Sequence, residues 1–281
     1  IEQVAEGAAE FLVHHAHGTL VAKKLILATG GRSIPKSGSD GFGYELARRL
    51  GHQITPTVPA LVPLLLDDAL FHNALSGLSQ EVELTTTVQG RHVDQRTGSL
   101  LWTHFGISGP VVMDASRFWT LAREQGRQVD VYGNLLPGQT LEQVREWFLG
   151  QMQDNPRRSL IKTLAQRLPH RFADAIIQYA GIDPHTAIGQ LPRKDREQAL
   201  AALTKFPFAI QNDRGWNYAE VTAGGIPLEE INFRTMESKL VRGLYLIGEI
   251  LDCDGRIGGF NFQWAWATGH LAGQAVMRGS A

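Results

Sequence analysis

The sequence predicts an α/β fold in which a doubly wound parallel sheet is interrupted by inserted β and then α material. Two apolar runs, residues 25–28 and 244–247, each lead into glycine, as strands buried on both faces of a parallel sheet do. They lie near opposite ends of the chain, and the residues between them show first strand-like and then helical spacing. An insertion in one doubly wound domain explains this order most simply.

Composition limits the function classes. The 281 residues are 43% hydrophobic and 20% charged, which suffices for one large domain or two ordinary ones with buried cores. A net charge of -1 argues against nucleic acid or an anionic membrane as the main partner, and favours a small-molecule substrate. The single cysteine, Cys253, excludes a disulfide framework, suggests no metal site and fits a cytoplasmic location. The apolar run 58–66 contains prolines and is too short to span a membrane.

The first fifty residues predict a hairpin, a strand and a helix. Residues 10–21 contain two β-like runs around a His-Gly turn, which is typical of a β-hairpin. The strand at 25–28 follows, and Gly30 and Gly31 then turn the backbone sharply. Residues 42–50 have the spacing of an amphipathic helix.

The middle of the chain predicts two inserted subdomains. Strand-like runs occur at 60–66, 82–88, 99–102, 111–113 and 128–132, and their even spacing suggests a small barrel or sandwich. Helical spacing occurs at 140–149, 159–168, 171–179 and 194–203, and prolines separate these runs. The predicted parts are therefore residues 1–56 and 204–281 for the doubly wound domain, 57–137 for a β-barrel-like subdomain and 138–203 for a helical subdomain.

The strongest site pattern follows the second apolar strand. A loop rich in glycine and acidic residues leads from that strand into a final helix at 261–277. The residues that carry the pattern are Gly248, Glu249, Asp252, Asp254, Gly258 and Gly259. The N-terminus of a helix presents free N–H groups and partial positive charge, which suit an anionic ligand atom such as a flavin oxygen or a pyrophosphate. Acidic side chains in the loop can accept hydrogen bonds from ribityl hydroxyls.

Several motifs, in order and with compatible spacing from about residue 10 to 275, resemble those of a known family. They are Ala28-Thr29-Gly30-Gly31 with Gly41, the segments 103–110 and 222–226, Met236-Glu237-Ser238-Lys239, and the segment 248–269. They resemble the HI0933/YhiN/BaiN-like family of bacterial FAD-dependent oxidoreductases, the aminoacetone oxidase-like flavoproteins. The resemblance implies an FAD-binding domain of the two-dinucleotide-binding type with an inserted β-barrel and helical subdomain. It also implies two-electron transfer between a small organic substrate and FAD, with NAD(P)H or O2 as second electron carrier.

The resemblance also assigns candidate site residues. The cofactor-binding candidates are Thr29, Gly30, Gly31, Gly248, Glu249, Asp252, Gly258, Gly259, Asn261 and Gln263. Asn261 and Gln263 have an alternative interpretation as capping residues, and Trp264 and Trp266 are expected in the core. His104 and Ser108 are the catalytic candidates, and His104 would donate a proton to a substrate carbanion. The alternative interpretation is a structural role for each of them.

One expected element is missing from the sequence. Members of this family open with a strand, a G-x-G-x-x-G loop and a helix that binds the FAD pyrophosphate, and we expect this chain to lack that unit. Gly41-Phe42-Gly43 is the only Gly-x-Gly, and the resemblance assigns it to a loop beside the flavin. We therefore expect weak FAD binding and marginal stability for the chain alone. Two rival hypotheses are a truncated, non-catalytic flavoprotein remnant and an RNA-modifying flavoprotein, the latter disfavoured by the net charge.

Overall fold

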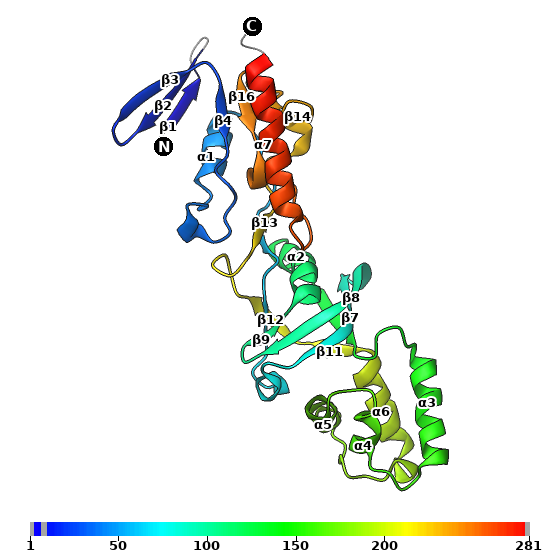
Figure 1. The fold of residues 1–281 in the computed structure, drawn as a ribbon. Helices are drawn as coiled ribbons and strands as arrows, with labels where there is room; N and C mark the ends of the chain where they lie inside the picture. Colours follow the sequence, from blue (N-terminus) through cyan, green and yellow to red (C-terminus); the bar gives the residue numbers. More distant parts are fainter. Residues whose placement is uncertain (1–2, 7–9, 279–281) are drawn as a thin grey trace. The chain divides into compact units, whose positions relative to one another are not determined.

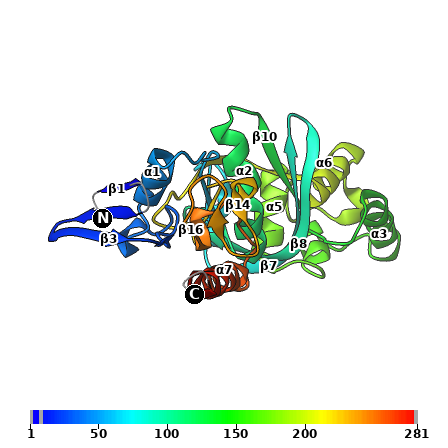
Figure 2. The same ribbon diagram turned by 90° about the horizontal axis from the view of Figure 1, so that it is seen from above.

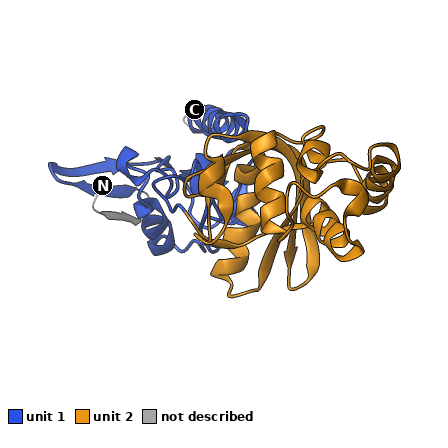
Figure 3. Cartoon of the chain, turned by 90° about the horizontal axis from the view of Figure 1, so that it is seen from below, with its two compact units in different colours: residues 1–62, 214–281 blue, residues 63–213 orange. Residues whose placement is uncertain are grey.

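The computed structural model describes residues 3–6 and 10–278, and its contacts divide the chain into two compact units. Unit 1 combines Ile1–Val62 with Arg214–Ala281, and unit 2 is the continuous stretch Pro63–Asp213 (Figure 3). Unit 1 is therefore discontinuous in sequence, as expected when one segment is inserted into another domain. Within the described ranges, no helix combines the length and the apolar character needed to cross a bilayer.

The four-stranded sheet of unit 1 joins the two ends of the chain. Its strands, in spatial order, are β14 (Ile231–Asn232), β15 (Glu237–Ser238), β16 (Leu244–Leu246) and β4 (Leu25–Leu27). β16 and β4 pair in parallel, with Leu244 opposite Leu25 and Leu246 opposite Leu27, and Figure 1 shows them side by side. The prediction that these two glycine-ended runs are neighbouring strands that finish on the same side is confirmed.

The prediction that the first apolar run is buried on both faces is wrong. Leu27 is 1% exposed, but Ile26 is 39% exposed, and Ala28 after the strand is exposed as well. The reason is the position of β4, which stands at the end of the strand order and pairs with β16. A strand at the edge of a sheet leaves part of its surface without a neighbouring strand.

The remaining elements of unit 1 surround this sheet. β1 (Gln3–Glu6), β2 (Phe11–His15) and β3 (Gly18–Ala22) form an antiparallel ribbon, which confirms the predicted hairpin. The other elements are α1 (Phe42–Arg49), β5 (Val58–Ala60) paired with β13 (Val221–Ala223), the 3₁₀ helices η1 (Pro35–Ser37), η4 (Leu228–Glu230) and η5 (Gly248–Ile250), and α7 (Phe260–Arg278). α1 and α7 pack against the sheet through a shared core that includes Leu46, Ala272 and Leu246. The predicted helices at 42–50 and 261–277 are thereby confirmed.

Unit 2 contains a seven-stranded sheet. In spatial order its strands are β11 (Phe206–Phe208), β10 (Val129–Asn134), β7 (Ser79–Val88), β8 (Arg91–Thr103), β9 (Gly106–Ser108), β6 (Leu64–Leu66) and β12 (Ile210–Asp213). Ala209 alone separates β11 from β12, although they stand at opposite ends of the order. The sheet therefore curves until its two ends meet at Ala209, whose carbonyl accepts the N–H of Asp67 at 3.0 Å.

One predicted strand of unit 2 is a helix. Residues 111–113, predicted as β from their β-branched composition, begin α2 (Pro110–Glu124), which lies against β7 and β8 (Figure 2). Pro110 occupies the first turn, where a missing N–H costs nothing. Val111, Val112, Ala115 and Trp119 are buried at helical spacing, and this longer periodicity outweighs the local β propensity of the first residues.

The helices of unit 2 share one core with its sheet. They are α3 (Leu141–Asp154), α4 (Leu160–Leu164), α5 (His170–Tyr179) and α6 (Arg193–Thr204), with the 3₁₀ helices η2 (Phe71–Leu75) and η3 (Ile188–Gln190). The ring of Trp102 in the sheet lies tilted against two others, with centroids 5.7 Å from Phe172 of α5 and 5.9 Å from Phe208 of β11. The four predicted helices are confirmed, and a single hydrophobic cluster joins them to the strands.

Candidate functional site

Unit 1 contains a pocket with a volume of about 520 Å³ at the end of its parallel strand pair. We call it the unit 1 pocket. Its lining residues are Ala28, Gly30, Ile34, Leu61, Glu220, Val221, Ile247, Gly248, Glu249, Arg256, Ile257, Gly258, Gly259, Asn261, Phe262, Ala265 and Trp266. Because the ends of parallel strands meet at one edge of a sheet, the loops after β4 and β16 form opposite parts of its wall.

Glycines form much of the wall because the backbone there adopts conformations that other residues rarely take. Gly30 has φ 70°, and Gly248 has φ 72°. Gly31, just behind the wall, has no room for a side chain, since a Cβ atom would overlap the hydroxyl of Thr222 and the carboxyl of Glu249. The wall therefore presents bare backbone, against which a flat ligand can lie closely.

The side chain of Glu249 is held by the strand next to it. Its Oε1 accepts the backbone N–H of Thr222 at 3.0 Å. The Thr222 hydroxyl oxygen in turn accepts the N–H groups of Arg32 at 2.7 Å and Ser33 at 3.3 Å, which fixes the loop after β4. Burial raises the pKa of the Glu249 carboxyl above its ordinary value, against the hydrogen bonds from Thr222, which lower it.

The phenol of Tyr44 stands beside the same loop. Its O–H donates to the backbone carbonyl of Glu249 at 3.3 Å. Burial, reinforced by the negative charge of Glu249, raises the pKa of the Tyr44 hydroxyl well above its ordinary value. Tyr44 therefore remains a neutral hydrogen-bond donor that fixes the backbone of η5.

The start of α7 is pinned to the same loop. The Asn261 side chain accepts the N–H of Gly255 at 2.7 Å and donates to its carbonyl at 3.0 Å. Trp264 Nε1 donates to the carbonyl of Gly248 at 3.1 Å, and the Thr268 hydroxyl accepts the Gly248 N–H at 3.0 Å. The capping alternative for Asn261 therefore matches its contacts, because its amide closes the loop that precedes the helix.

Two aromatic residues of α7 stand exposed beside the pocket. Phe262 and Trp266 are 69% and 68% exposed, and their rings stack at 6.1 Å with an interplanar angle of 25°. The expectation that Trp266 lies in the core is wrong, because that face of α7 points toward the pocket. Trp264, on another face, packs against the core as expected.

Asp252 lies behind the pocket wall. Its Oδ2 accepts a hydrogen bond from the Thr55 hydroxyl at 3.0 Å, and its N–H donates to the carbonyl of Ile226 at 2.8 Å. The Thr55 hydroxyl also accepts the N–H of Gly225 at 2.9 Å. Asp252 thus ties the loop after β16 to the segment that follows α1.

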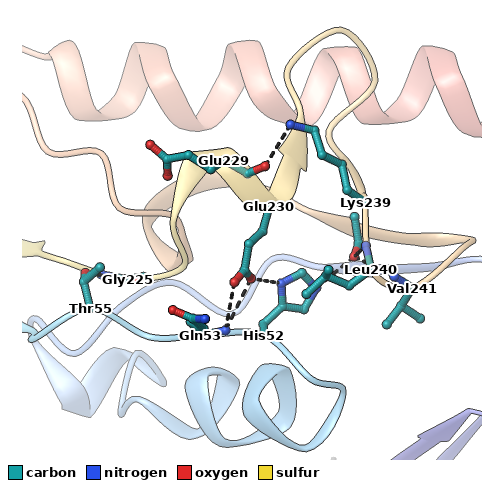
Figure 4. A network of polar contacts seen from close by, with 10 residues as sticks. His52, Gln53, Thr55, Gly225, Glu229, Glu230, Lys239, Leu240 and Val241 are labelled. Atoms are coloured by element: carbon teal, nitrogen blue, oxygen red, sulfur yellow. Dashed lines mark hydrogen bonds and ion pairs between the residues drawn. The ribbon is translucent and has the colours of Figure 1, made fainter.

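A second polar network holds that segment at its other end (Figure 4). His52 Nδ1 lies 2.6 Å from Glu230 Oε2, and His52 Nε2 lies 2.9 Å from the Ser238 hydroxyl. The Ser238 oxygen already accepts the N–H groups of Leu240 at 3.0 Å and Val241 at 2.9 Å. Both its lone pairs are therefore used, so Ser238 donates to Nε2, and His52 is neutral with its proton on Nδ1.

The order of Ser238, His52 and Glu230 is that of a hydrolytic triad, but its environment is structural. Ser238 is 6% exposed and His52 2% exposed, and the serine oxygen is saturated with donors. A nucleophilic oxygen must reach a substrate and gain electron density from its base. This network instead clamps β15 to the end of α1.

The structure brings six of the ten cofactor candidates together in the unit 1 pocket. They are Gly30, Gly248, Glu249, Gly258, Gly259 and Asn261. Thr29, Gly31, Asp252 and Gln263 belong to the same unit and lie outside the lining. His104 and Ser108 belong to unit 2: His104 is exposed in the tight turn between β8 and β9, and the Ser108 hydroxyl in β9 faces Met113 Sδ at 3.9 Å.

Several lining residues were not found from the sequence. Leu61, Glu220 and Val221 reach the pocket through the pairing of β5 with β13, and Ile34 is held there by the carbonyl of Trp216, which accepts its N–H. No local pattern indicates either contact. Thr222, which anchors Glu249, lies in one of the motifs that carry the resemblance, and that was the available signal. Across residues 3–6 and 10–278, no three His, Cys, Asp or Glu side chains converge as a metal site.

Comparisons with known proteins assign the chain to one family, and its relatives include two synthases and a reductase. The HI0933-like protein Rossmann domain matches residues 1–275. The chain is 37% identical over 262 residues to a ribosomal RNA dihydrouridine synthase of Escherichia coli (strain K12), covering 92% of this chain and 62% of that protein. It is 34% identical over 257 residues to a ribosomal RNA dihydrouridine synthase of Haemophilus influenzae, covering 91% of this chain and 61% of that protein.

The third relative has a different name. The chain is 32% identical over 276 residues to a 3-dehydro-bile acid delta(4,6)-reductase of Clostridium scindens, covering 98% of this chain and 67% of that protein. The chain thus spans about three fifths of the length of the two synthases and two thirds of the length of the reductase.

Proposed function

Since this chain belongs to the HI0933-like Rossmann-domain family, a family of flavoprotein oxidoreductases, we propose that it binds the ring system of FAD in the unit 1 pocket and serves the reduction of a carbon–carbon double bond. The observation that carries the proposal is the wall of this pocket. Bare backbone at Gly30 and Gly248 faces the same space as the held carboxyl of Glu249.

The residues of the pocket fit a flavin ring. A flat tricyclic ring lies closest to backbone without side chains, and the glycines supply such a surface. A volume of about 520 Å³ falls within the range of ordinary cofactor and ligand pockets. The wall is mostly apolar, with Val221, Ile247 and Ile257 among its members, and its polar groups are few. Bound FAD would supply the hydride chemistry.

The protein's own groups would orient the ligand and handle a proton. Gly258 and Gly259 stand at the N-terminus of α7, where free N–H groups and the helix dipole favour a negatively charged ligand atom. Burial raises the pKa of Glu249, so its carboxyl keeps a proton to a higher pH than an ordinary glutamate does. Phe262 and Trp266 would shield the ligand from water.

The relatives' names point to one chemistry with two substrate classes. A delta(4,6)-reductase reduces double bonds of a 3-dehydro bile acid, and a dihydrouridine synthase produces dihydrouridine in ribosomal RNA. In both, hydrogen is added across a carbon–carbon double bond. We propose a small organic molecule with a double bond conjugated to a carbonyl as substrate, because the reductase matches 98% of this chain and the pocket is lined mainly by apolar groups.

Uridine in ribosomal RNA is the second candidate substrate. The identities of 37% and 34% to two ribosomal RNA dihydrouridine synthases favour it, although the net charge of -1 does not. In either case NAD(P)H is the expected source of electrons, because each reduction consumes two electrons that the flavin must regain. O2 accepts electrons and would serve as second carrier only in a reaction that oxidises its substrate. His104 and Ser108 keep their proposed roles at the substrate, in unit 2.

The substrate test is a reoxidation experiment. The protein, expressed as its gene encodes it and loaded with FAD, is reduced without oxygen and mixed with a steroid dienone or with ribosomal RNA from a strain that lacks the gene. Return of the oxidised flavin spectrum, with a product two hydrogens heavier, identifies the substrate class. A protein that reoxidises with neither substrate contradicts the proposed chemistry.

The pocket assignment is tested by a matched pair of glycines. Gly259 (φ 88°) lines the pocket, Gly138 (φ 76°) lies in unit 2, and an added Cβ would meet nothing within 4 Å at either. Both alanine variants should therefore lose about 1 kcal/mol of folding free energy through backbone strain. Gly259→Ala should also weaken FAD retention about tenfold, while Gly138→Ala should retain FAD like the wild type. Equal FAD retention in the two variants would contradict the assignment.

A further inference from the structure

Four non-glycine residues in the described ranges have left-handed backbone. They are Ile34 (φ 51°), Leu61 (φ 48°), Gln89 (φ 50°) and Met236 (φ 60°). In this region the Cβ atom crowds the neighbouring carbonyl, so L-residues other than Asn and Asp rarely adopt it, and a β-branched residue such as isoleucine is a clear outlier.

Two of the four are explained by turn geometry. Gln89 and Gly90 form the two-residue turn between β7 and β8, where Val88 pairs with Arg91. Such turns require left-handed backbone at both central positions. Met236 lies in the tight turn between β14 and β15, where its N–H bonds the carbonyl of Asn232 at 2.7 Å.

The other two occupy no such hairpin turn, and both line the unit 1 pocket. Surrounding contacts hold Ile34 in place: its N–H donates to the carbonyl of Trp216 at 2.9 Å, and its own carbonyl accepts the Ser37 N–H at 2.8 Å. The Leu61 carbonyl accepts the N–H of Glu220, another lining residue, at 3.1 Å.

Burial does not account for the residue type at position 34. The side chain of Ile34 is 49% exposed, so it adds little to the core, whereas Leu61 is 5% exposed. Glycine at position 34 would adopt the same backbone without strain. A strained conformation that the surroundings enforce, with an apolar side chain half exposed at a pocket, is typical of a residue kept for a ligand.

We propose that Ile34 and Leu61 are flavin-contact residues, whose left-handed backbone directs two apolar side chains onto the ring bound in the unit 1 pocket. The inference rests on the proposed function and deepens it, because it names the residues that fix the position of the ring. Val221 and Ile247 continue the same apolar wall. Together these side chains would contact the hydrocarbon part of the flavin, while Glu249 and the start of α7 provide its polar contacts.

The test separates ligand contact from folding. Lumiflavin, the ring system alone, and FAD are titrated by fluorescence into the protein as its gene encodes it, and the melting temperature of each variant is measured without ligand. Ile34→Gly should melt at the same temperature as the wild type or higher, because strain is relieved, yet bind lumiflavin about tenfold more weakly, because an apolar contact is lost. Ile34→Val, which keeps a branched apolar side chain, should bind within about threefold of the wild type.

Gln89→Gly is the matched control. It relieves the same backbone strain on an exposed turn of unit 2, so its melting temperature should also be unchanged or higher, and its flavin affinity should equal that of the wild type. Leu61→Ala, measured at a temperature at which circular dichroism shows it folded, should weaken lumiflavin binding about tenfold.

The outcomes separate the two proposals. Wild-type affinity in Ile34→Gly and Leu61→Ala, or an equal loss in Gln89→Gly, overturns the inference while the pocket assignment stands. A wild-type protein that binds neither lumiflavin nor FAD contradicts the proposed function and the inference with it. Weaker binding confined to Ile34→Gly and Leu61→Ala, with unchanged melting of Ile34→Gly, supports both.

Discussion

Two glutamates of unit 1 illustrate how a buried carboxyl serves either the fold or a site. Glu230 ends the 3₁₀ helix η4, and Glu249 lies within the 3₁₀ helix η5. Both side chains reach across to another segment and accept backbone N–H groups there: Gln53 donates to Glu230 at 3.3 Å, and Thr222 donates to Glu249 at 3.0 Å. Local structure alone does not separate the two residues.

Their surroundings differ. The Glu230 carboxyl lies 2.6 Å from Nδ1 of the His52 imidazole. The other ring nitrogen of His52 is hydrogen-bonded to the Ser238 hydroxyl. Glu249 faces a pocket, and the hydrogen bonds from Thr222 only partly offset the effect of burial, so its pKa is raised. A carboxyl whose hydrogen-bond partners are all supplied by the fold is a structural element. A carboxyl beside a cavity, where hydrogen bonds offset only part of the effect of burial on its pKa, is a candidate for chemistry.

The largest expected effect on stability is at His52. His52→Ala leaves the Glu230 carboxyl and the Ser238 hydroxyl without their partner in a site where the histidine is 2% exposed. The free energy of unfolding, measured with urea, should fall by about 3 kcal/mol. FAD affinity of the folded protein should stay at the wild-type level, because this network lies outside the pocket lining.

The control for His52 is an exposed ion pair of the same unit. Glu45 and Arg49 lie 3.8 Å apart with side chains 58% and 54% exposed. Glu45→Ala should cost less than about 0.5 kcal/mol. A loss at His52 as small as this, or a selective loss of FAD affinity in His52→Ala, would mean that the second network belongs to the site and not to the fold.

The next effect is on Glu249 and depends on pH. Because folding raises the pKa of this carboxyl above its usual 4.5, the native state holds its proton longer than the unfolded state does. The stability that Glu249 contributes is therefore fully present below pH 4.5 and is lost as pH rises through the raised pKa. Glu249→Gln keeps an oxygen for the Thr222 N–H and cannot ionise, so the variant should lack this loss.

Urea denaturation of the wild type and of Glu249→Gln over a pH series checks the sign. The variant should gain stability relative to the wild type as pH rises from 4.5 toward neutrality. If Glu249 holds a proton for the reaction, turnover should fall by about a hundredfold in Glu249→Gln. A variant that loses stability at neutral pH would place Glu249 in the same class as Glu230.

Sequence patterns predicted the pocket residues that follow the ends of the two parallel strands. The runs at 25–28 and 244–247 lead into glycine, and glycine at a strand end is where a parallel sheet presents its backbone to a ligand, so Gly30, Gly248 and Glu249 could be selected. The paired glycines before α7 belong to the same loop pattern. Each of these signals comes from residues that are neighbours in sequence, and the selected residues line the pocket in the structure.

The residues that escaped prediction depend on contacts distant in sequence. Leu61 lines the pocket because β5 pairs with β13. Ile34 does so because the Trp216 carbonyl accepts its N–H and the Thr222 hydroxyl oxygen accepts the N–H of the preceding Ser33. Trp266 was assigned to the core because helical periodicity separates faces without saying which of them is buried. The helix at 111–113 was missed because three residues with β propensity were weighed without the proline that precedes them.

The smallest expected effect on stability is at the second histidine of interest. His104 is exposed in a turn of unit 2 and contacts Phe105 edge-on at 5.1 Å, in contrast to the enclosed His52. His104→Ala should therefore change the free energy of unfolding by less than about 0.5 kcal/mol. If His104 donates a proton to the substrate, turnover should fall about a hundredfold at unchanged FAD content.

Asp252→Ala should do the reverse and lower FAD content more than His104→Ala does, since its loss frees the loop that Thr55 holds. Equal FAD loss in the two variants would remove the distinction between a residue that holds the cofactor and a residue that serves turnover.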